Sequence, residues 1–268
     1  KDYVDRLSPG YPWDILRTRL SGVTYVCVSN ERRTELAELF SCPEDELHVV
    51  YNGVDTRTLL GISEKGYALA ERMDILDREL VILTPVRVVK SKNLEFVLET
   101  LRLLKESGID PVGVVTGPPD PHDRSSIEYF RGLLQRRGEN GLDDHMKFVY
   151  ESGPDSETPF TIPPPIVGEL FRLSDMVLIA SYTEGFGMPV LEAGLAGKPI
   201  VASSRVPAAH EIAHEHMMMF DLDEGPGKVA DWIRDWRGNS PVQRLQRTVR
   251  QRYTWRQILK QDIEPLLR

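Results

Sequence analysis

The sequence is poor in cysteine and contains no long apolar run. Cys27 and Cys42 are the only two cysteines among 268 residues, too few for a disulfide framework or a four-cysteine zinc site. No stretch of 18 apolar residues occurs, which argues against a transmembrane helix. The sequence also lacks an Asn-x-Ser/Thr acceptor for glycosylation. Together these absences predict a protein of the reducing cytoplasm.

The net charge and the N-terminal residues narrow the possible classes of protein further. Lys plus Arg number 33 and Asp plus Glu number 41, a net charge of −8, which disfavours general binding to nucleic acid phosphates. The N-terminal residues KDYVDRLSPGYPWD contain neither an initiator Met nor the apolar centre of a signal peptide. We therefore expect the chain to be a segment of a longer protein.

Most of the chain alternates between short apolar runs and helical patterns. The runs predict strands at 80–86, 111–117, 146–150, 175–181, 198–204 and 216–220. The segments between them predict helices at 93–107, 125–138, 166–174, 189–197 and 206–214, with a further helical region from 225 onward. Nearly wholly apolar strands that alternate with helices are typical of a parallel sheet covered on both faces. The expected fold class is thus α/β, with a Rossmann-like doubly wound sheet.

The first 55 residues form a different pattern. A helical piece at 14–20 precedes expected strands at 23–29 and 46–55, which flank a helix at 31–40, and a linker-like stretch follows at 56–66. We place a domain boundary near 53–62. The predicted organisation is an incomplete domain over 1–55, a larger domain over 56–250, and a C-terminal helix over 251–268.

The sharpest motif runs from Glu184 to Glu192, directly after the strand expected at 175–181. Its loop and helix start consist of Gly185, Phe186, Gly187, Met188 and Pro189. Glycines let backbone amides approach a ligand, and a helix N-terminus favours an anion such as phosphate. Carboxylates can accept hydrogen bonds from the hydroxyls of a sugar or a ribose. Spacing alone favours a ligand site and a plain glycine-rich turn about equally.

A second motif, Arg87 to Asn93, follows the strand expected at 80–86. Arg87 offers a planar fork of donors and Lys92 a point charge, which together suit a diphosphate. A solvated basic loop is the alternative interpretation.

These motifs occur in a recognisable order. The segments are Arg87…Lys92-Asn93, Asn52-Gly53-Val54-Asp55, Ser174-Asp175, Glu184-Gly-Phe-Gly-Met-Pro…Glu192-Ala193-Gly194 and Gly197-Lys198-Pro199-Ile200-Val201-Ala202. Together they resemble the retaining glycosyltransferases of the GT-B fold, in particular family 4 (glycosyl transferase group 1). The resemblance covers residues 23–266 and implies two facing Rossmann-like domains. Segment 1–55 would then end the acceptor domain, and 56–250 would bind the nucleotide-sugar donor.

The resemblance also implies roles for individual residues. Arg87 and Lys92 resemble the diphosphate pair, and Glu184 the carboxylate that touches the transferred sugar. The amides around Gly185, Phe186, Gly187 and Met188 resemble the loop that holds sugar and phosphate, and Glu192 resembles the carboxylate on the ribose. The residues at 151–165 depart from the family as an insertion, and the tail helix would cross back toward the first domain.

The implied function is transfer of a sugar from a nucleoside diphosphate sugar to a sugar, lipid or small-molecule acceptor, with retention at the anomeric carbon. A non-catalytic nucleotide-sugar-binding module and a GT-B-fold epimerase are the alternatives. No cofactor or essential metal is expected, nor any nucleic-acid partner. The chain alone is expected to be inactive and prone to self-association.

Two further patterns have competing interpretations. His210-Glu211-Ile212-Ala213-His214 matches the H-E-x-x-H zinc pattern, but its short helix and missing third ligand disfavour a metal. The basic tail, Arg234 to Arg268, is typical of a solvated helix surface. The rival interpretation is docking to the anionic inner face of a membrane or to the missing part of the first domain.

Overall fold

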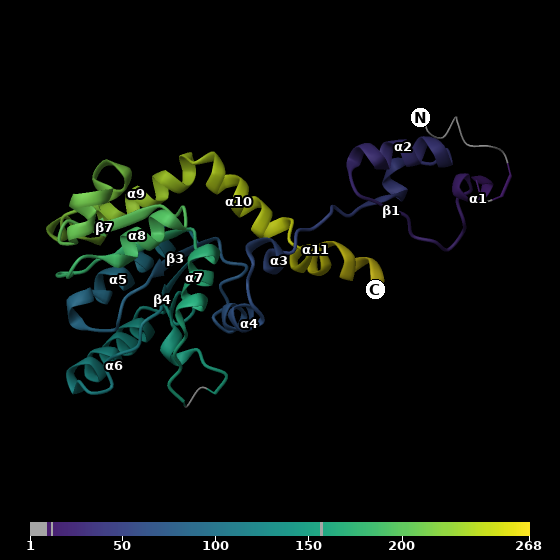
Figure 1. Cartoon of the computed structure of the whole chain (residues 1–268). Coiled ribbons are helices and arrows are strands. Elements are labelled where there is room, and N and C mark those ends of the chain that lie inside the picture. The colour runs from purple at the N-terminus through teal and green to yellow at the C-terminus, as the bar shows by residue number, and fades with distance from the viewer. Residues whose placement is uncertain (1–9, 12, 156–157) are drawn as a thin grey trace. The chain divides into compact units, whose positions relative to one another are not determined.

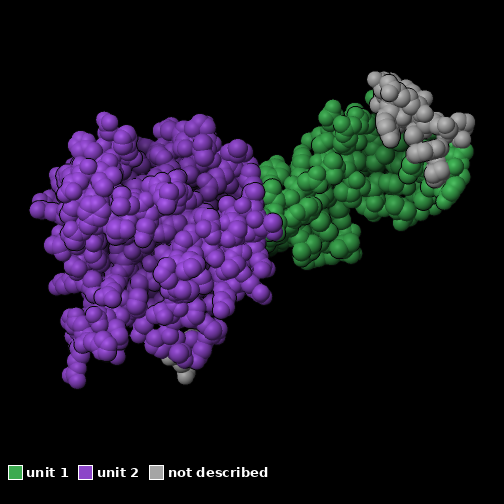
Figure 2. Space-filling view, viewed as in Figure 1, with its two compact units in different colours: residues 1–55, 252–268 green, residues 56–251 purple. Residues whose placement is uncertain are grey.

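The computed structural model describes residues 10–11, 13–155 and 158–268. The beginning of the expected N-terminal segment, residues 1–9 and 12, and residues 156–157 of the expected insertion lie outside this description. The chain divides into two compact units (Figure 2): unit 1 comprises Lys1–Asp55 with Arg252–Arg268, and unit 2 comprises Thr56–Gln251. Each unit is described by itself.

Unit 2 is built on a six-stranded sheet in which every pairing is parallel. Its strands are β3 (Leu80–Thr84), β4 (Pro111–Val115), β5 (Met146–Phe148), β6 (Met176–Ile179), β7 (Ile200–Ser203) and β8 (Met218–Phe220). Their order is β5-β4-β3-β6-β7-β8, the doubly wound order. All six predicted strands are present, each shorter than predicted: β3, β4 and β5 lose residues at the carboxyl end, β6 and β7 at both ends, and β8 at the amino end. The predicted fold class is confirmed.

Helices cover both faces of this sheet (Figure 1). One face packs against α5 (Leu94–Glu106), α6 (Arg124–Glu139) and α9 (Gly225–Asn239). The other packs against α4 (Glu64–Arg72), α7 (Pro164–Leu173) and α8 (Met188–Leu195). The two apolar clusters meet the sheet from opposite sides because successive strand residues point to opposite faces. For example, Leu80 and Ile82 belong to one cluster, and Val81 and Leu83 to the other.

The stretch predicted as a linker is folded. It forms α3 (Thr56–Leu60) and the start of α4, and side chains of α7 form hydrogen bonds with both segments. The Glu169 carboxylate accepts hydrogen bonds from the backbone N and Oγ of Ser63, at 3.1 and 3.0 Å, and Arg172 donates to the carbonyls of Leu60 and Gly61. The linker prediction is wrong because these polar contacts come from a helix more than a hundred residues away in the chain.

The helix predicted at 206–214 is irregular. A π-helical turn, η5 (Ala209–Ala213), is followed by a 3-10 turn, η6 (His214–His216). His214 has a φ of +21°, outside the helical region. The chain thus leaves the helical path where an α-helix was expected.

A charge cluster lies at the amino ends of the strands, opposite the carboxyl edge. Arg250, from helix α10 (Pro241–Arg252), donates from both terminal nitrogens to Asp175, each at 2.8 Å. Asp175 also accepts from the backbone N of Val81 at 2.7 Å. The Lys198 ammonium donates to the Ser174 carbonyl at 2.7 Å, and burial lowers the pKa of Lys198 below its usual value. The cluster joins α10 to β3 and β6.

Unit 1 contains little regular structure. It holds α1 (Trp13–Arg17), α2 (Asn30–Phe40), the 3-10 turn η2 (Glu44–Glu46), and a two-stranded parallel sheet of β1 (Val26–Cys27) and β2 (His48–Val49). The strands predicted at 23–29 and 46–55 are thus reduced to two residues each. Several large apolar side chains in this unit are exposed, among them Ile15, Leu16, Leu20, Val23, Val26 and Val28.

The C-terminal tail is a broken helix rather than the continuous one predicted for 251–268. After α10 it continues as α11 (Trp255–Ile258), the π-turn η8 (Leu259–Ile263) and the 3-10 turn η9 (Glu264–Leu267). Within unit 1, Val54 bridges to Thr254, with Val54 N donating to the Tyr253 carbonyl at 2.8 Å. Ile258 is fully buried, whereas Trp255 and Leu259 are about half exposed.

None of the helices in the described part of the chain is long and apolar enough to cross a membrane.

Candidate nucleotide-sugar site

The two sequence motifs meet at the point where the strand order reverses. From β3 the chain proceeds outward through β4 and β5, and it then returns to β6 on the other side of β3. In open parallel sheets, ligands bind in the crevice outside the carboxyl ends of two such strands. The loop after β3 contains Arg87 and Lys92, and the loop after β6 contains Glu184. Tyr182 N donates to the Ser91 carbonyl at 2.8 Å, which joins the two loops directly.

Lys92 and Glu184 form an ion pair. The Lys92 Nζ lies 2.7 Å from Glu184 Oε1, and the side chains are only 17% and 12% exposed. Glu184 Oε1 also accepts a hydrogen bond from Ser181 Oγ at 2.9 Å. Two residues predicted separately, from motifs about ninety positions apart, therefore contact one another.

The Arg87 loop is braced from β4. A Cβ on Gly117 would lie 2.6 Å from the Val86 carbonyl oxygen and 2.9 Å from Arg87 N, so only glycine allows this approach. Val88 N donates to the Pro118 carbonyl at 3.2 Å. The Arg87 side chain itself is exposed and has no hydrogen bond or ion pair with any residue that the structure describes. It remains available to a ligand.

The glycine-rich loop leads into α8 as predicted. Gly187 precedes the helix with a φ of +105°, and a Cβ there would lie 2.5 Å from Val206 Cγ1. The Phe186 carbonyl accepts from Ala208 N at 2.8 Å, which fixes the loop from behind. Pro189 stands in the first turn, and no side chain caps the helix N-terminus. Pro189 has no N–H and Val190 N donates to the Gly187 carbonyl at 2.9 Å, so at this helix start the amide of Met188 is available to an anion.

Glu192 lies one turn into α8. Its side chain is exposed and makes no hydrogen bond or ion pair within the described part of the chain. The structure therefore does not bring Glu192 into contact with Glu184. Both carboxylates nevertheless belong to the segment that follows β6.

Sequence reasoning missed the support behind Glu184. Ser181 and Ser203 are fully buried, and Ser203 Oγ donates to the Ser181 carbonyl at 2.6 Å. Ser203 closes β7, the strand next to β6, so the contact is invisible in the sequence order. The only signal was the presence of a serine at the carboxyl end of each strand.

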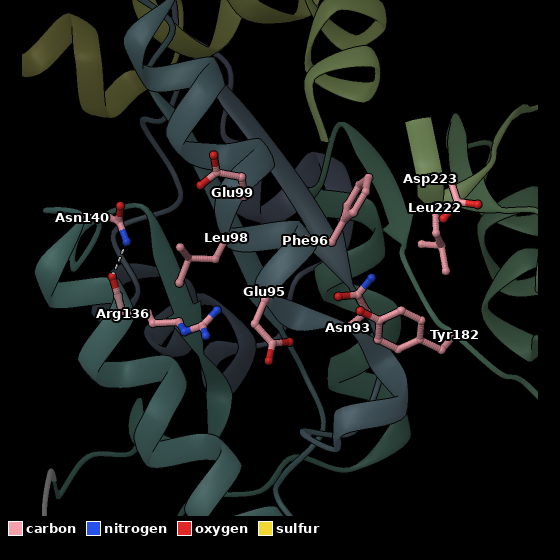
Figure 3. Close-up of a pocket in the computed structure, with 10 residues that line it drawn as sticks. All are labelled: Asn93, Glu95, Phe96, Leu98, Glu99, Arg136, Asn140, Tyr182, Leu222 and Asp223. Atoms are coloured by element: carbon pink, nitrogen blue, oxygen red, sulfur yellow. Dashed lines mark hydrogen bonds between the residues drawn. The ribbon is translucent and has the colours of Figure 1, made fainter. Parts of the chain in front are cut away.

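A groove of about 470 Å³ opens beside this site, along α5. In Figure 3, Asn93 and Tyr182 lie next to one another on one side of the helix, and Arg136 and Asn140 from α6 lie on the other. Leu222 and Asp223, from the 3-10 turn η7 (Leu222–Glu224), complete the rim near Phe96. Asn93 and Tyr182 also belong to the two loops of the switch point, so the groove begins at the edge of the site.

Two metal-like patterns have ordinary structural roles. His210 belongs to the π-helical turn η5 rather than to an α-helix, and its Nε2 lies 2.6 Å from the Ser204 carbonyl. The pair Asp221 and Asp223 follows β8 with Asp-x-Asp spacing, which sequence reasoning also missed. Asp221 forms a capping box with Glu224 and accepts a bond from Ser204 Oγ. Within the described ranges, no group of three His, Cys, Asp or Glu residues could hold a metal ion.

The fold and this crevice define a class. The chain resembles solved GT-B glycosyltransferases, which include Anabaena HepE in complex with UDP and glucose (TM-score 0.53, 19% identity, 91% of this chain and 62% of that one). The C-terminal domain of a glycosyl transferase group 1 protein (LpcC) from Francisella tularensis matches 79% of this chain and 98% of its own, with a TM-score of 0.52 and 20% identity. The GT-B fold is thereby established.

The family follows from the sequence. Residues 70–218 match the model for glycosyl transferases group 1, and the chain belongs to this family. An uncharacterised glycosyltransferase of Methanocaldococcus jannaschii is 25% identical over 246 residues, which cover 89% of this chain and 58% of the relative. A D-inositol 3-phosphate glycosyltransferase of Thermomonospora curvata is 29% identical over 184 residues, or 65% of this chain and 39% of the relative. The chain thus spans roughly two to three fifths of these relatives' length.

Proposed function

We propose that this chain binds the nucleoside diphosphate sugar donor of a glycosyltransferase that retains configuration at the anomeric carbon. The observation that carries the proposal is the Lys92–Glu184 pair, which lies in the switch-point crevice bordered by the glycine-rich loop and α8. A cation suits a phosphate, a carboxylate suits sugar hydroxyls, and uncapped amides suit an anion. Solved HepE structures that contain UDP, or UDP-glucose, support the donor class.

In the proposed reaction the bond from the anomeric carbon to the diphosphate oxygen breaks, and a bond to the acceptor oxygen forms on the same face of the sugar. The proton of the acceptor hydroxyl passes to the departing diphosphate. Charge accumulates on the departing diphosphate. Arg87, Lys92 and the N-terminus of α8 stabilise that charge, which is how preorganised donors lower a barrier. Glu184 orients the sugar through its hydroxyls and Glu192 the ribose, with no essential metal in this scheme.

We further propose that unit 1 belongs to an acceptor-binding domain and that this chain by itself transfers no sugar. Catalysis of group transfer depends on holding both substrates in a reactive geometry. The proposed location is the cytoplasm, in keeping with two unpaired cysteines. Peripheral contact with a membrane through the basic tail is part of the same proposal, although Arg250 and Arg237 already pair with Asp175 and Glu79.

Calorimetric titration with UDP, GDP, ADP and their glucose or mannose conjugates tests the donor assignment. Arg87→Ala should weaken nucleoside diphosphate binding by about 1.5–3 kcal/mol, the scale of a charge-assisted hydrogen bond. Because the Arg87 side chain has no hydrogen bond or ion pair among the described residues, its loss should leave the thermal unfolding midpoint unchanged. Arg131→Ala, at an exposed position of α6, is the matched control. Equal affinity of wild type and Arg87→Ala for all three diphosphates would refute the assignment.

A further inference from the structure

We infer that Glu184 serves two partners in turn and acts as a latch on Lys92. In the donor-free protein Glu184 neutralises Lys92. When the donor binds, Lys92 turns to the diphosphate, and the hydroxyls of the sugar take its place on Glu184. This inference rests on the proposed function and adds to it a mechanism by which the site favours nucleotide sugars over free nucleotides.

The first argument is the isolation of the pair. Both side chains are mostly buried, and a charge in such a place needs a partner. Glu184 is the only hydrogen-bond or ion-pair partner of the Lys92 ammonium among the residues that the structure describes. An ammonium has three donors, so Lys92 retains the capacity to bind a phosphate. It cannot, however, present a full positive charge while the Glu184 carboxylate lies 2.7 Å away.

The second argument is the asymmetry of the Glu184 carboxylate. Both of its contacts, with Lys92 Nζ and with Ser181 Oγ, go to Oε1. Oε2 accepts no hydrogen bond from any residue that the structure describes. It is therefore the oxygen available to a sugar hydroxyl.

The third argument is that Glu184 is anchored and Lys92 is not. The carboxylate is held by Ser181, and the Ser181 backbone is held in turn by Ser203 from the neighbouring strand. Lys92 arrives on a long side chain with four rotatable bonds, from a different loop. When a diphosphate enters, the lysine is thus the partner that moves. Ser181 is a positioning residue that keeps Glu184 in place through the exchange.

The latch predicts effects of opposite sign for two ligands. Glu184→Gln releases Lys92 and removes a negative charge next to the diphosphate, so UDP should bind about three- to tenfold tighter, a change of about 0.7–1.4 kcal/mol. The same variant should lose the extra affinity that the sugar confers, so UDP-glucose should no longer bind better than UDP. A Glu184 that contacted only the sugar would leave UDP binding unchanged.

The experiment is calorimetric titration of the whole chain with UDP and UDP-glucose, and with the corresponding GDP-mannose and ADP-glucose pairs. Wild type is compared with Glu184→Gln, Ser181→Ala and Ser181→Thr. Ser181→Ala should reduce the preference for the nucleotide sugar about threefold or more. Ser181→Thr, which keeps the hydroxyl, should restore it. Glu128→Gln on α6 and Ser107→Ala at the end of α5 are matched controls, and circular dichroism verifies the fold of each variant.

The possible outcomes separate the two ideas. Tighter UDP binding by Glu184→Gln, with loss of the preference for the nucleotide sugar, supports the latch. If wild type binds a nucleoside diphosphate and Glu184→Gln binds it equally or more weakly, the latch is wrong and the donor-binding function stands. If wild type binds none of these nucleotides or nucleotide sugars, the proposed function is wrong, and the latch, which rests on that function, is wrong as well.

Discussion

Replacement of Arg250 by Met should destabilise unit 2 without affecting its ligand site. The two guanidinium nitrogens each lie 2.8 Å from an Asp175 oxygen, and the Asp175 side chain is only 4% exposed. The methionine keeps most of the apolar stem of Arg250 but leaves Asp175 with the Val81 amide as its remaining hydrogen-bond partner among the described residues. Loss of one member of a buried pair typically costs about 3–5 kcal/mol.

We expect a loss near the lower limit, about 3 kcal/mol, because the Val81 amide still stabilises the carboxylate. For a domain of this size, about 2–4 °C of unfolding temperature is lost per kcal/mol, so the midpoint should fall by roughly 6–12 °C. Thermal and urea unfolding followed by circular dichroism measure the change. Arg244→Met on the same helix is the control, since among the described residues the Arg244 side chain bonds only to the Gly238 carbonyl.

A loss below about 1 kcal/mol, the range of exposed ion pairs, would refute the reasoning. The double variant Asp175→Asn with Arg250→Met should be more stable than Arg250→Met alone, because it removes the unpaired charge. Nucleotide affinity should be equal in all these variants, since the pair lies at the amino ends of the strands and the candidate site at their carboxyl ends.

Five further outcomes are expected. Gly187→Ala should destabilise the fold by about 1–3 kcal/mol and weaken nucleotide binding, because its Cβ would overlap Val206; unchanged unfolding and affinity would contradict the close approach. Cys42 should react with a thiol reagent before Cys27, since burial raises the pKa of the Cys27 thiol and lowers its thiolate fraction at any given pH; faster labelling in Cys42→Ser than in Cys27→Ser would show the reverse order. Metal analysis should find no stoichiometric zinc; one zinc per chain, lost in His210→Ala, would overturn this. The chain alone should bind a donor nucleotide but show no transfer from a radiolabelled donor, and light scattering should show self-association through the exposed apolar side chains of unit 1; turnover, or a clean monomer at high concentration, would count against each.

The sheet of unit 2 could be predicted because its signal is local. Runs such as Leu80–Thr84 and Pro111–Val115 are apolar at nearly every position, which is characteristic of strands buried on both faces. The carboxyl-edge loops then followed from the strand positions, and with them the approximate location of Arg87, Lys92 and Glu184. The direct pairing of Lys92 with Glu184 could not be predicted, because it depends on β6 lying next to β3.

The wrong predictions share one cause: contacts between residues far apart in the sequence determine the backbone structure of short or polar segments. The 56–66 stretch has the composition of a linker, yet Glu169 and Arg172 order it from a distant helix. Residue 66 shows how tight that contact is, since a Cβ on Gly66 would overlap the Glu169 carboxylate. The prediction for the tail was wrong in the opposite direction, because it expected more regular structure than is present. The helical pattern of the tail sequence is continuous, but its backbone changes from α to π to 3-10 geometry. Local propensity is a weak guide where packing of this kind intervenes.

The bridge between Val54 and Thr254 has a consequence for engineering. The chain leaves unit 1 after Asp55 and re-enters it at Arg252, and the hydrogen bond from Val54 N to the Tyr253 carbonyl places exit and re-entry side by side. Closely spaced ends are the condition under which domain insertion and circular permutation are tolerated. Residues 56–251 therefore form an exchangeable cassette: another module whose ends lie equally close can be spliced between Asp55 and Arg252, and a short linker can join the cassette's own ends.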